Sequence, residues 1–225
     1  MQLTNEVKII IGISVITLIL VVGAAFLFGG NSSSSSAQNA QPIKNVSALV
    51  RPNSAELNNH SKVTLVEFGD FQCPACGAEY PVVTQILQNY KGKINYVFRN
   101  FPLPQHQNAA EAAEAAEAAK AQGKFFDMFN LLYQNQNTWS DVSDPTSYFV
   151  TYAKALHLDL KQFQSDVKSK KYAKVIQQDI DDGYAVGVNA TPTFYLNGVP
   201  MVGVLPYSDF QKAIDKDLQQ ADSKK

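Results

Sequence analysis

The sequence predicts an α/β domain with a long helical insertion, preceded by one N-terminal transmembrane helix. An uncharged apolar run at residues 9–28 predicts the transmembrane helix. A strand–helix–strand pattern at residues 62–102 predicts a βαβ unit with a parallel pair of strands. A long stretch of helix-forming residues then separates this unit from a predicted hairpin at residues 191–204.

The composition places no strong net charge on the chain. Its formal net charge is −1, with 19 basic and 20 acidic residues spread along the sequence. A nucleic-acid-binding protein needs a basic face. We therefore expect no nucleic-acid partner.

The apolar run at residues 9–28 has the length of a membrane span. About 20 residues, at roughly 1.5 Å each, cross a hydrocarbon core about 30 Å thick. A cleaved signal peptide is the alternative, but its apolar region is usually only about 7–15 residues long and ends in a small-residue cleavage site. Here Phe26, Leu27 and Phe28 end the run. We therefore expect an uncleaved anchor in contact with membrane lipid.

Basic residues near the anchor set its expected orientation. Lys8 and the terminal amine precede it, and the next basic residue is Lys44. The positive-inside tendency places residues 1–8 in the cytoplasm and the remainder outside. Residues 29–45 are rich in Gly, Ser, Asn and Gln, which predicts a flexible linker. The expected location is the cell membrane, with residues 46–222 forming an extracytoplasmic domain.

The first part of this domain alternates strand and helix. Residues 62–70 are apolar and β-branched, which is typical of a mostly buried strand. Residues 77–92 have helical spacing, with Pro81 inside the helix, and residues 93–102 form a second predicted strand. The three elements are close enough in sequence for a parallel pair joined by a crossover helix.

Four helices are predicted in an insertion at about residues 105–185. They cover residues 108–123, 124–136, 147–156 and 160–183. In the first of them Glu111, Glu114 and Glu117 could form an acid or metal site, but a solvated helix face is the favoured interpretation. After the insertion, Asn197-Gly198 between two apolar runs predicts a hairpin, and residues 207–220 predict a final helix.

Cys73 and Cys76 are the only cysteines, and three interpretations of the pair compete. Structural zinc needs four ligands, whereas the three histidines are scattered along the chain. A structural disulfide between them would close a very short loop and stabilise the fold little. We therefore favour the third interpretation, a redox pair.

A redox pair needs an activated thiol, a resolving thiol and a proton carrier. Cys73 stands where the strand ends and the helix begins, so we expect an exposed thiolate with a lowered pKa. Cys76, one turn into the helix, is expected to be more shielded and to resolve a mixed disulfide. Glu67 on the preceding strand is the candidate proton carrier. Asp70 is nearer in sequence, but we favour a loop or cap role for it.

The motifs together resemble a known family. Cys73-Pro74-Ala75-Cys76 after a Glu-bearing strand, Pro81, a long helical insertion and Thr191-Pro192-Thr193-Phe194 before a hairpin are similar to the thioredoxin fold in its DsbA-like form. The resemblance covers residues 48–220 and is strongest to a membrane-tethered bacterial subgroup. It implies a cis Thr191–Pro192 bond that faces the cysteines. It also implies that substrate contacts come from four residues, namely Thr191, Pro192, Pro74 and Ala75.

Two departures from the family pattern leave the direction of electron flow open. The strongly oxidising DsbA proteins have a His where this chain has Ala75. A Thr before the cis proline, as in Thr191, also occurs in isomerase and reductase relatives. His106 falls where related sequences often carry a His, and we favour a packing role at a helix start for it.

The leading hypothesis is a membrane-anchored protein-disulfide oxidoreductase that introduces disulfides into exported, cysteine-containing proteins. The resemblance implies reoxidation by a quinone-linked thiol oxidase of the membrane, and no metal or organic cofactor is indicated. A reductase or isomerase kept reduced by a membrane partner is the alternative with the same chemistry. A tethered binding or chaperone domain with a structural disulfide is the alternative from another class.

Overall fold

The structure is a computed structural model that describes residue 43 and residues 48–223. The anchor predicted at residues 9–28, the segment at residues 1–8 and most of the linker lie outside the described residues. Within the described part of the chain, no helix combines the length and apolar character needed to span a membrane.

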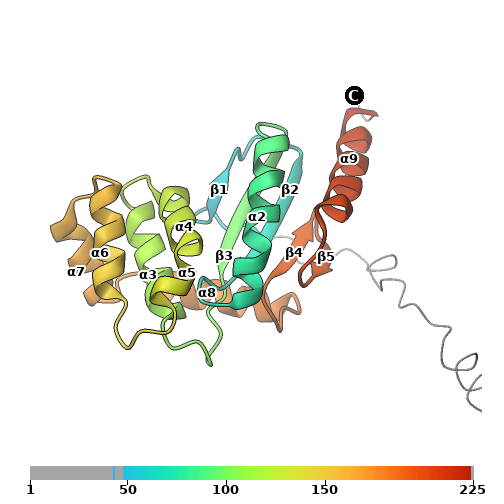
Figure 1. Cartoon of the computed structure of the whole chain (residues 1–225). Helices are drawn as coiled ribbons and strands as arrows, with labels where there is room; N and C mark the ends of the chain where they lie inside the picture. Colours follow the sequence, from blue (N-terminus) through green and yellow to red (C-terminus); the bar gives the residue numbers. More distant parts are fainter. Residues whose placement is uncertain (1–42, 44–47, 224–225) are drawn as a thin grey trace, which may run out of the picture. The chain divides into compact units, whose positions relative to one another are not determined.

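A five-stranded mixed sheet forms the centre of the domain (Figure 1). Its strands, in spatial order, are β1 (Ala55–Leu57), β3 (Ile94–Asn100), β2 (Val63–Gly69), β4 (Thr193–Leu196) and β5 (Val199–Val202). The pair β2 and β3 is parallel, as predicted for the βαβ unit, and the other pairs are antiparallel. Strand β1 was not predicted, because an edge strand of three residues carries too little periodicity to detect.

The predicted hairpin is confirmed. Strands β4 and β5 pair around Asn197 and Gly198, whose φ angles of 48° and 85° are both in the left-handed region. Asn and Gly tolerate this region better than other residues, which is why this dipeptide favours a two-residue hairpin turn. The hairpin adds two antiparallel strands to the edge of β2.

Helices cover both faces of the sheet (Figure 1). Helices α2 (Pro74–Asn89) and α9 (Tyr207–Ser223) share one core with the β2 residues Val63 and Leu65. Helix α8 (Ala173–Ala185) packs on the opposite face, where Val66 and Phe68 of β2 meet Ile180. Because successive strand side chains alternate between faces, Glu67 points to the same side as Leu65, toward α2.

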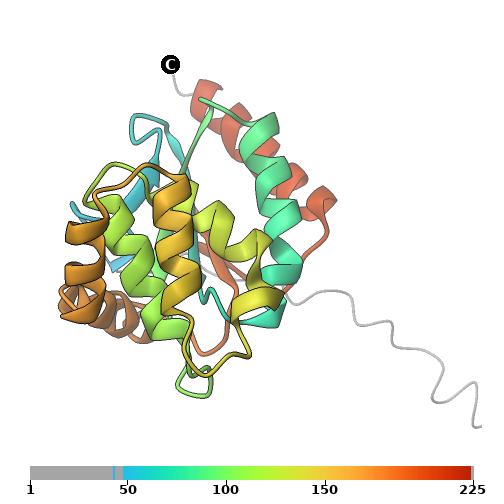
Figure 2. The same cartoon turned by 60° about the vertical axis from the view of Figure 1, so that its left-hand side comes forward.

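The insertion forms a helical block beside the sheet (Figures 1 and 2). It consists of α3 (Ala109–Lys120), α4 (Phe125–Gln134), α5 (Gln136–Trp139), α6 (Thr146–Ala155) and α7 (Leu160–Lys168), and α8 leads back to the sheet. The single helix predicted at residues 160–183 is wrong, because α7 and α8 are separate. The chain breaks between them at Lys170, whose φ of 51° is incompatible with a continuous right-handed helix.

The favoured interpretation of the α3 glutamates as a solvated face is also wrong for two of them. Glu114 and Glu117 are each only 4% exposed. Glu114 accepts a hydrogen bond from the backbone N–H of Tyr172 at 3.0 Å, and Glu117 accepts one from Asn100 Nδ2 at 3.0 Å. The physical reason is that α4, α6, α7 and α8 all pack around α3, so little of its surface reaches solvent.

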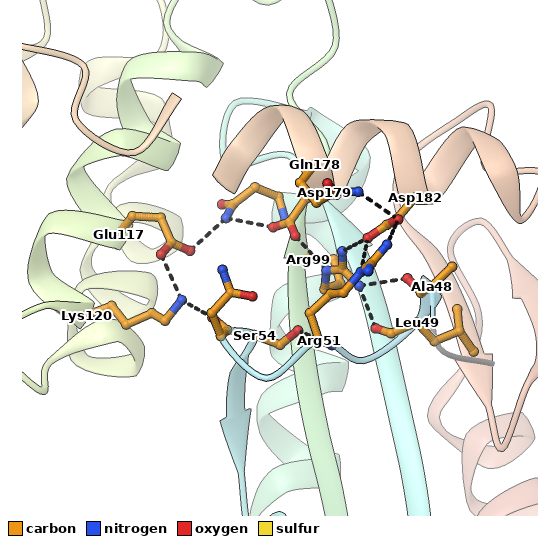
Figure 3. Close-up of polar contacts among 12 residues, drawn as sticks. Ala48, Leu49, Arg51, Ser54, Arg99, Glu117, Lys120, Gln178, Asp179 and Asp182 are labelled. Atoms are coloured by element: carbon orange, nitrogen blue, oxygen red, sulfur yellow. Dashed lines mark hydrogen bonds and ion pairs between the residues drawn. The ribbon is translucent and has the colours of Figure 1, made fainter. Parts of the chain in front are cut away.

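A buried ion-pair network joins α8 to the sheet (Figure 3). Arg99 of β3 is 0% exposed and lies 2.7 Å from Asp179 and 2.6 Å from Asp182. Its guanidinium also donates to the carbonyls of Ala48 and Leu49. The buried guanidinium of Arg99 is therefore fully paired, which is the condition under which a buried arginine is tolerated.

Candidate active site

The cysteine motif forms the N-terminus of α2. Cys73 is the N-cap, with extended φ and ψ of −65° and 122°, and Pro74 is the first helical residue. Proline is well suited to that position because its missing N–H would be unpaired there anyway. The two cysteines are free thiols in this structure.

Asp70 shapes the loop that leads into this helix. Its side chain is buried and accepts hydrogen bonds from the backbone N–H of Gln72 at 2.7 Å and of Leu103 at 2.9 Å. Its Oδ2 also lies 2.6 Å from Nδ1 of His106, just before α3. The loop role expected for Asp70 is confirmed. His106 lies just before α3, where its ring makes this polar contact with Asp70.

The two thiols differ strongly in acidity. The Cys76 thiol donates a hydrogen bond that lowers the pKa of Cys73 to about 5, with further help from the backbone N–H groups of Cys76 and Ala75, against the opposing effect of burial. Burial raises the pKa of Cys76 well above its ordinary value, and the charge of Glu67 raises it further. At neutral pH one thiol of the pair is therefore ionised and the other is not.

The expectation that the Cys73 thiolate is exposed is wrong. Cys73 is 6% exposed and Cys76 is 1% exposed, so both are buried in this state, although Cys73 is the more accessible. The loop before β4 covers the sulfur, because the carbonyl oxygen of Thr191 lies 3.5 Å from Cys73 Sγ. Sequence spacing could not show this contact between residues 118 positions apart.

Glu67 lies in the core beneath the cysteine pair. It is 2% exposed, and the hydroxyl of Tyr96 donates a hydrogen bond to its Oε2. Burial raises the pKa of Glu67 to about 8, although the bond from Tyr96 opposes the shift, and the charge of Glu79 adds to it. A carboxyl group with this pKa can take up and release a proton near neutral pH.

The loop before β4 brings the remaining predicted residues to the same place. The Thr191–Pro192 peptide bond is cis, as expected. Thr191 Oγ1 is buried and has no hydrogen-bond partner among the described residues. Pro192 is tied to the end of β5, since its carbonyl accepts a bond from the N–H of Gly203 at 3.0 Å. Pro74 is exposed and Ala75 half-buried, so these two form the outer rim of the motif.

Two residues near the cysteines were missed by sequence reasoning. Gln136 of α5 donates from Nε2 to the carbonyls of Phe71 at 2.7 Å and Cys73 at 3.0 Å. Glu79 is 0% exposed on the buried face of α2. Nothing in the sequence marks Gln136, but the helical spacing from Cys76 to Glu79 would have placed a carboxyl group on the face that carries the second thiol.

The arrangement can perform thiol–disulfide exchange. It combines a low-pKa thiol at a helix N-terminus, a buried second thiol within hydrogen-bond reach, and a buried carboxyl group of raised pKa. Among the described residues, no group of three or more His, Cys, Asp or Glu side chains is placed to hold a metal ion.

Comparison with known proteins identifies what the chain is similar to. A sequence model of the family described as Thioredoxin matches residues 58–216. The probable disulfide bond formation protein D of Bacillus anthracis is 30% identical over 164 residues, which covers 70% of this chain and 75% of that protein. The crystal structure of Wolbachia pipientis α-DsbA1 superposes with a TM-score of 0.72 at 24% identity, covering 81% of this chain and 99% of that one. The last likeness concerns the fold alone.

Other curated relatives are much longer than the matched region. The Na⁺/H⁺ antiporter NhaA 1 of Mycobacterium sp. strain KMS is 36% identical over 160 residues, which covers 67% of this chain. The chain spans only 25% of the length of that antiporter.

Proposed function

This chain belongs to the thioredoxin family, in its DsbA-like group, and from that premise we propose that it is a dithiol oxidase that introduces disulfides into exported proteins. The observation that carries the proposal is the difference in acidity between two adjacent thiols. The pKa of Cys73 is lowered to about 5, whereas burial raises the pKa of Cys76. This asymmetry lets Cys73 leave readily as a thiolate while Cys76 stays inside the protein.

The proposed reaction runs through a mixed disulfide. A substrate thiolate attacks Sγ of Cys73 in the Cys73–Cys76 disulfide, and Cys76 leaves with the bonding electron pair and takes a proton from Glu67. A second substrate thiolate then attacks the substrate sulfur of the mixed disulfide. Cys73 leaves as a thiolate, the substrate is oxidised by two electrons, and the enzyme is left as a dithiol.

The acidity of Cys73 favours the oxidising direction. A stabilised thiolate stabilises the reduced form of the pair and so raises its reduction potential. At pH 7, a thiol of pKa about 5 favours the reduced form by roughly 2 kcal/mol more than thioredoxin's thiol of pKa about 7, which corresponds to about 50 mV. From thioredoxin's value of about −270 mV, this contribution alone brings the potential to roughly −220 mV.

Substrate binding is assigned to the rim of the motif. The backbone of Thr191 and the ring of Pro192 would hold an extended substrate segment across the cysteines, with Pro74 and Ala75 on the other side. Val202 and Val204, which follow on the same hairpin, are 60% and 55% exposed. An apolar rim of this kind suits the unfolded segments of cysteine-containing proteins.

The cellular setting of the proposal comes from the sequence. Residues 9–28 would anchor the chain in the lipid bilayer with residues 1–8 in the cytoplasm, and residues 29–45 would let the catalytic domain move above the outer surface. No organic cofactor or metal is required, because the disulfide itself carries the electrons. A quinone-linked thiol oxidase of the membrane would restore the disulfide.

One observation favours a second candidate, a reductase or isomerase kept reduced by a membrane partner. Ala75 cannot donate the hydrogen bond or charge that a histidine at this position would provide to the thiolate. The two candidates share every residue of the site and differ in the potential at which the pair works.

The test is the reduction potential of the pair, measured on the full-length protein in detergent by equilibration with glutathione. For the oxidase we expect a value less negative than about −200 mV, to which the acidity of Cys73 contributes about 50 mV. A value near thioredoxin's −270 mV would contradict the oxidase and leave the reductase.

A parallel measurement separates both candidates from a tethered binding or chaperone domain. Cys73→Ser should abolish disulfide transfer to a reduced, unfolded substrate protein. If that variant protects the substrate from aggregation as well as the wild type does, and the wild type transfers no disulfide, the pair is structural.

A further inference from the structure

Glu79 is a buried carboxyl group that the steps described above do not use. Its side chain is 0% exposed. It lies three residues after Cys76, and both belong to the buried face of α2. Glu67 enters the same core from β2, because Leu65, two residues earlier on the strand, packs there against α2. A second carboxyl group thus lies one helical turn beyond the resolving thiol.

The two oxygens of Glu79 have different environments. Oε2 accepts a hydrogen bond from the backbone N–H of Leu205 at 3.1 Å. Oε1 is buried, and no described residue offers it a hydrogen bond. An unpaired buried oxygen makes the ionised form costly. Burial accordingly raises the pKa of Glu79 to about 7, against the opposing effect of the Leu205 N–H.

The described groups around Glu67 and Glu79 include no positive charge that would stabilise their ionised forms, so protonation is the main way to reduce the cost of burying them. Tyr96 of β3 donates to Glu67, and Tyr133 of α4 lies close enough for the charge of Glu67 to raise its pKa. From α9, the fully buried side chains in this core are Phe210 and Ile214, and the partly buried Tyr207 accepts a hydrogen bond from Asn89. The acid of α9 that contacts α2, Asp215, accepts a bond from Tyr90 at the far end of the helix.

Glu79 lies close enough to Glu67 to affect the ionisation of Glu67. The charge of Glu79 raises the pKa of Glu67, and no cation is among the groups that shift the pKa of either. Two acids coupled in this way do not both ionise readily, so a proton that leaves one is favoured on the other.

The segment that Glu79 contacts leads to the surface. Leu205 lies between β5 and α9 and is half-buried, while its neighbours Val204 and Pro206 are exposed. Glu67, by contrast, is bonded to Tyr96, which is 0% exposed. Of the two carboxyl groups, Glu79 is therefore the one bonded to a segment with exposed residues.

We propose that Glu79 is the outer member of a proton relay that passes protons between Glu67 and solvent at the β5–α9 segment. The relay rests on the thiol–disulfide exchange proposed above. When a mixed disulfide at Cys73 is resolved, Cys76 gives its proton to the Glu67 carboxylate and its thiolate forms the Cys73–Cys76 bond. The bound thiol leaves with the electron pair of the broken bond. Glu67 then passes the proton to the Glu79 carboxylate, which releases it to water.

The test follows resolution in the reduced full-length chain mixed with oxidised glutathione. Formation of the glutathione mixed disulfide at Cys73 needs no proton from Cys76, so it is an internal control. Release of the second glutathione reports the proton-dependent step. Glu79→Gln is the informative variant, because its amide oxygen still accepts from Leu205 N–H but cannot carry a proton.

We expect Glu79→Gln to slow resolution about tenfold, less than the roughly hundredfold typical of losing a group that exchanges the proton directly, which we expect for Glu67→Gln. The wild-type rate should rise with pH through about 7, where Glu79 ionises, and the variant should lack that rise. Glu111→Gln, in the helical insertion, is the matched control and should behave as the wild type.

Each contrary outcome has a distinct meaning. If the mixed disulfide forms normally and Glu79→Gln resolves it with the wild-type rate and pH profile, the relay is overturned and the proposed function stands. If no mixed disulfide forms at Cys73 in the wild type, the proposed function itself fails, and the relay with it.

A measurement on the wild type alone guards against a variant that does not fold. Infrared difference spectra of the reduced and oxidised full-length chain, recorded across pH with isotope-labelled glutamate, should show two buried protonated carboxyl groups, one titrating near 7 and one near 8. Detection of only one such group would contradict the relay.

Discussion

At the scale of single residues, the reactivity of Cys73 depends on a neighbour more than on the helix that it begins. The largest influence on its pKa is the hydrogen bond from the Cys76 thiol, and the backbone N–H groups of Cys76 and Ala75 contribute less. A helix N-terminus alone is a common feature, whereas a shielded thiol one turn away is specific to this motif.

Removing that donor should make Cys73 an ordinary thiol. In Cys76→Ala we expect the pKa of Cys73 to rise from about 5 toward the unperturbed value of about 8.5. The pH dependence of alkylation by iodoacetamide measures this value directly. Cys76→Ser is the matched control, because its hydroxyl still donates and should keep the pKa low. Equal values in the two variants would contradict the assignment.

Glu67 should make the folded protein less stable at high pH. Its pKa is about 8 in the folded state and about 4.3 when unfolded, so the folded state binds more protons between these values. Stability from this group is fully present below pH of about 4.3 and is lost as pH rises through about 8.

Glu67→Gln removes this titration. We expect its free energy of unfolding to exceed that of the wild type by an amount that grows between pH of about 4 and 8, up to about 5 kcal/mol. Urea unfolding of the reduced proteins at several pH values measures the difference, and Glu111→Gln controls for loss of a carboxyl group elsewhere. A difference that does not change with pH would contradict the raised pKa.

At the scale of secondary-structure elements, α5 holds the start of α2 in place. Gln136 donates to the carbonyls of Phe71 and Cys73, and Gly77 leaves the space that its amide occupies. A Cβ on Gly77 would lie 2.2 Å from Gln136 Oε1. Gln136 thus connects the helical insertion to the cysteine motif.

This contact predicts that Gly77→Ala changes the free energy of unfolding in opposite directions with and without the Gln136 side chain. Gly77→Ala should destabilise the wild type by about 1–3 kcal/mol, because it displaces Gln136 from two buried carbonyls. In the Gln136→Ala background the same change should stabilise the protein by up to about 1 kcal/mol, the usual helix-propensity gain of Ala over Gly. Urea unfolding of the four proteins measures the coupling, and additive effects would contradict the contact.

At the scale of the whole domain, the network around Arg99 joins α8 to the sheet (Figure 3). Asp182 accepts bonds from Arg99 at 2.6 Å and from the partly exposed Arg51 at 2.8 Å. Burial opposes its ionisation, but the bonds from the two arginines outweigh burial and lower the pKa of Asp182 to about 2. The network therefore stabilises the packing of α8 on the sheet most strongly when Asp182 is ionised.

Asp182→Asn should weaken the domain in a pH-dependent way. The folded pKa of about 2 lies below the unfolded value of about 3.9, so the stabilisation is present above pH of about 4 and is lost as pH falls toward 2. At pH 7 we expect a loss of about 3–5 kcal/mol, since a buried arginine loses an ionised partner.

The measurement is urea unfolding at pH values from 7 down to 2. The difference between wild type and variant should shrink below pH of about 4. Asp181→Asn, an exposed neighbour on the same helix, is the control and should change stability little at any pH. A loss that is constant with pH would contradict the role of the charge.

Local sequence determined much of this domain. The β-branched run of β2, the Asn197-Gly198 turn and the order of strands and helices all follow from interactions between residues close in sequence. The Cys73–Cys76 spacing at a helix start, with Glu67 on the strand before it, likewise placed the candidate site. These features could be predicted because periodicity, turn chemistry and helix-end electrostatics act over only a few residues.

Only the tertiary structure decided which polar groups are buried and what they contact. Glu114 and Glu117 have the sequence pattern of an exposed face but are covered by other helices of the insertion. The contacts of Cys73 with Thr191 and of Gln136 with the motif join residues far apart in the chain. Burial and long-range hydrogen bonds depend on how distant segments pack, and these interactions set the acidities of Cys73, Glu67 and Glu79.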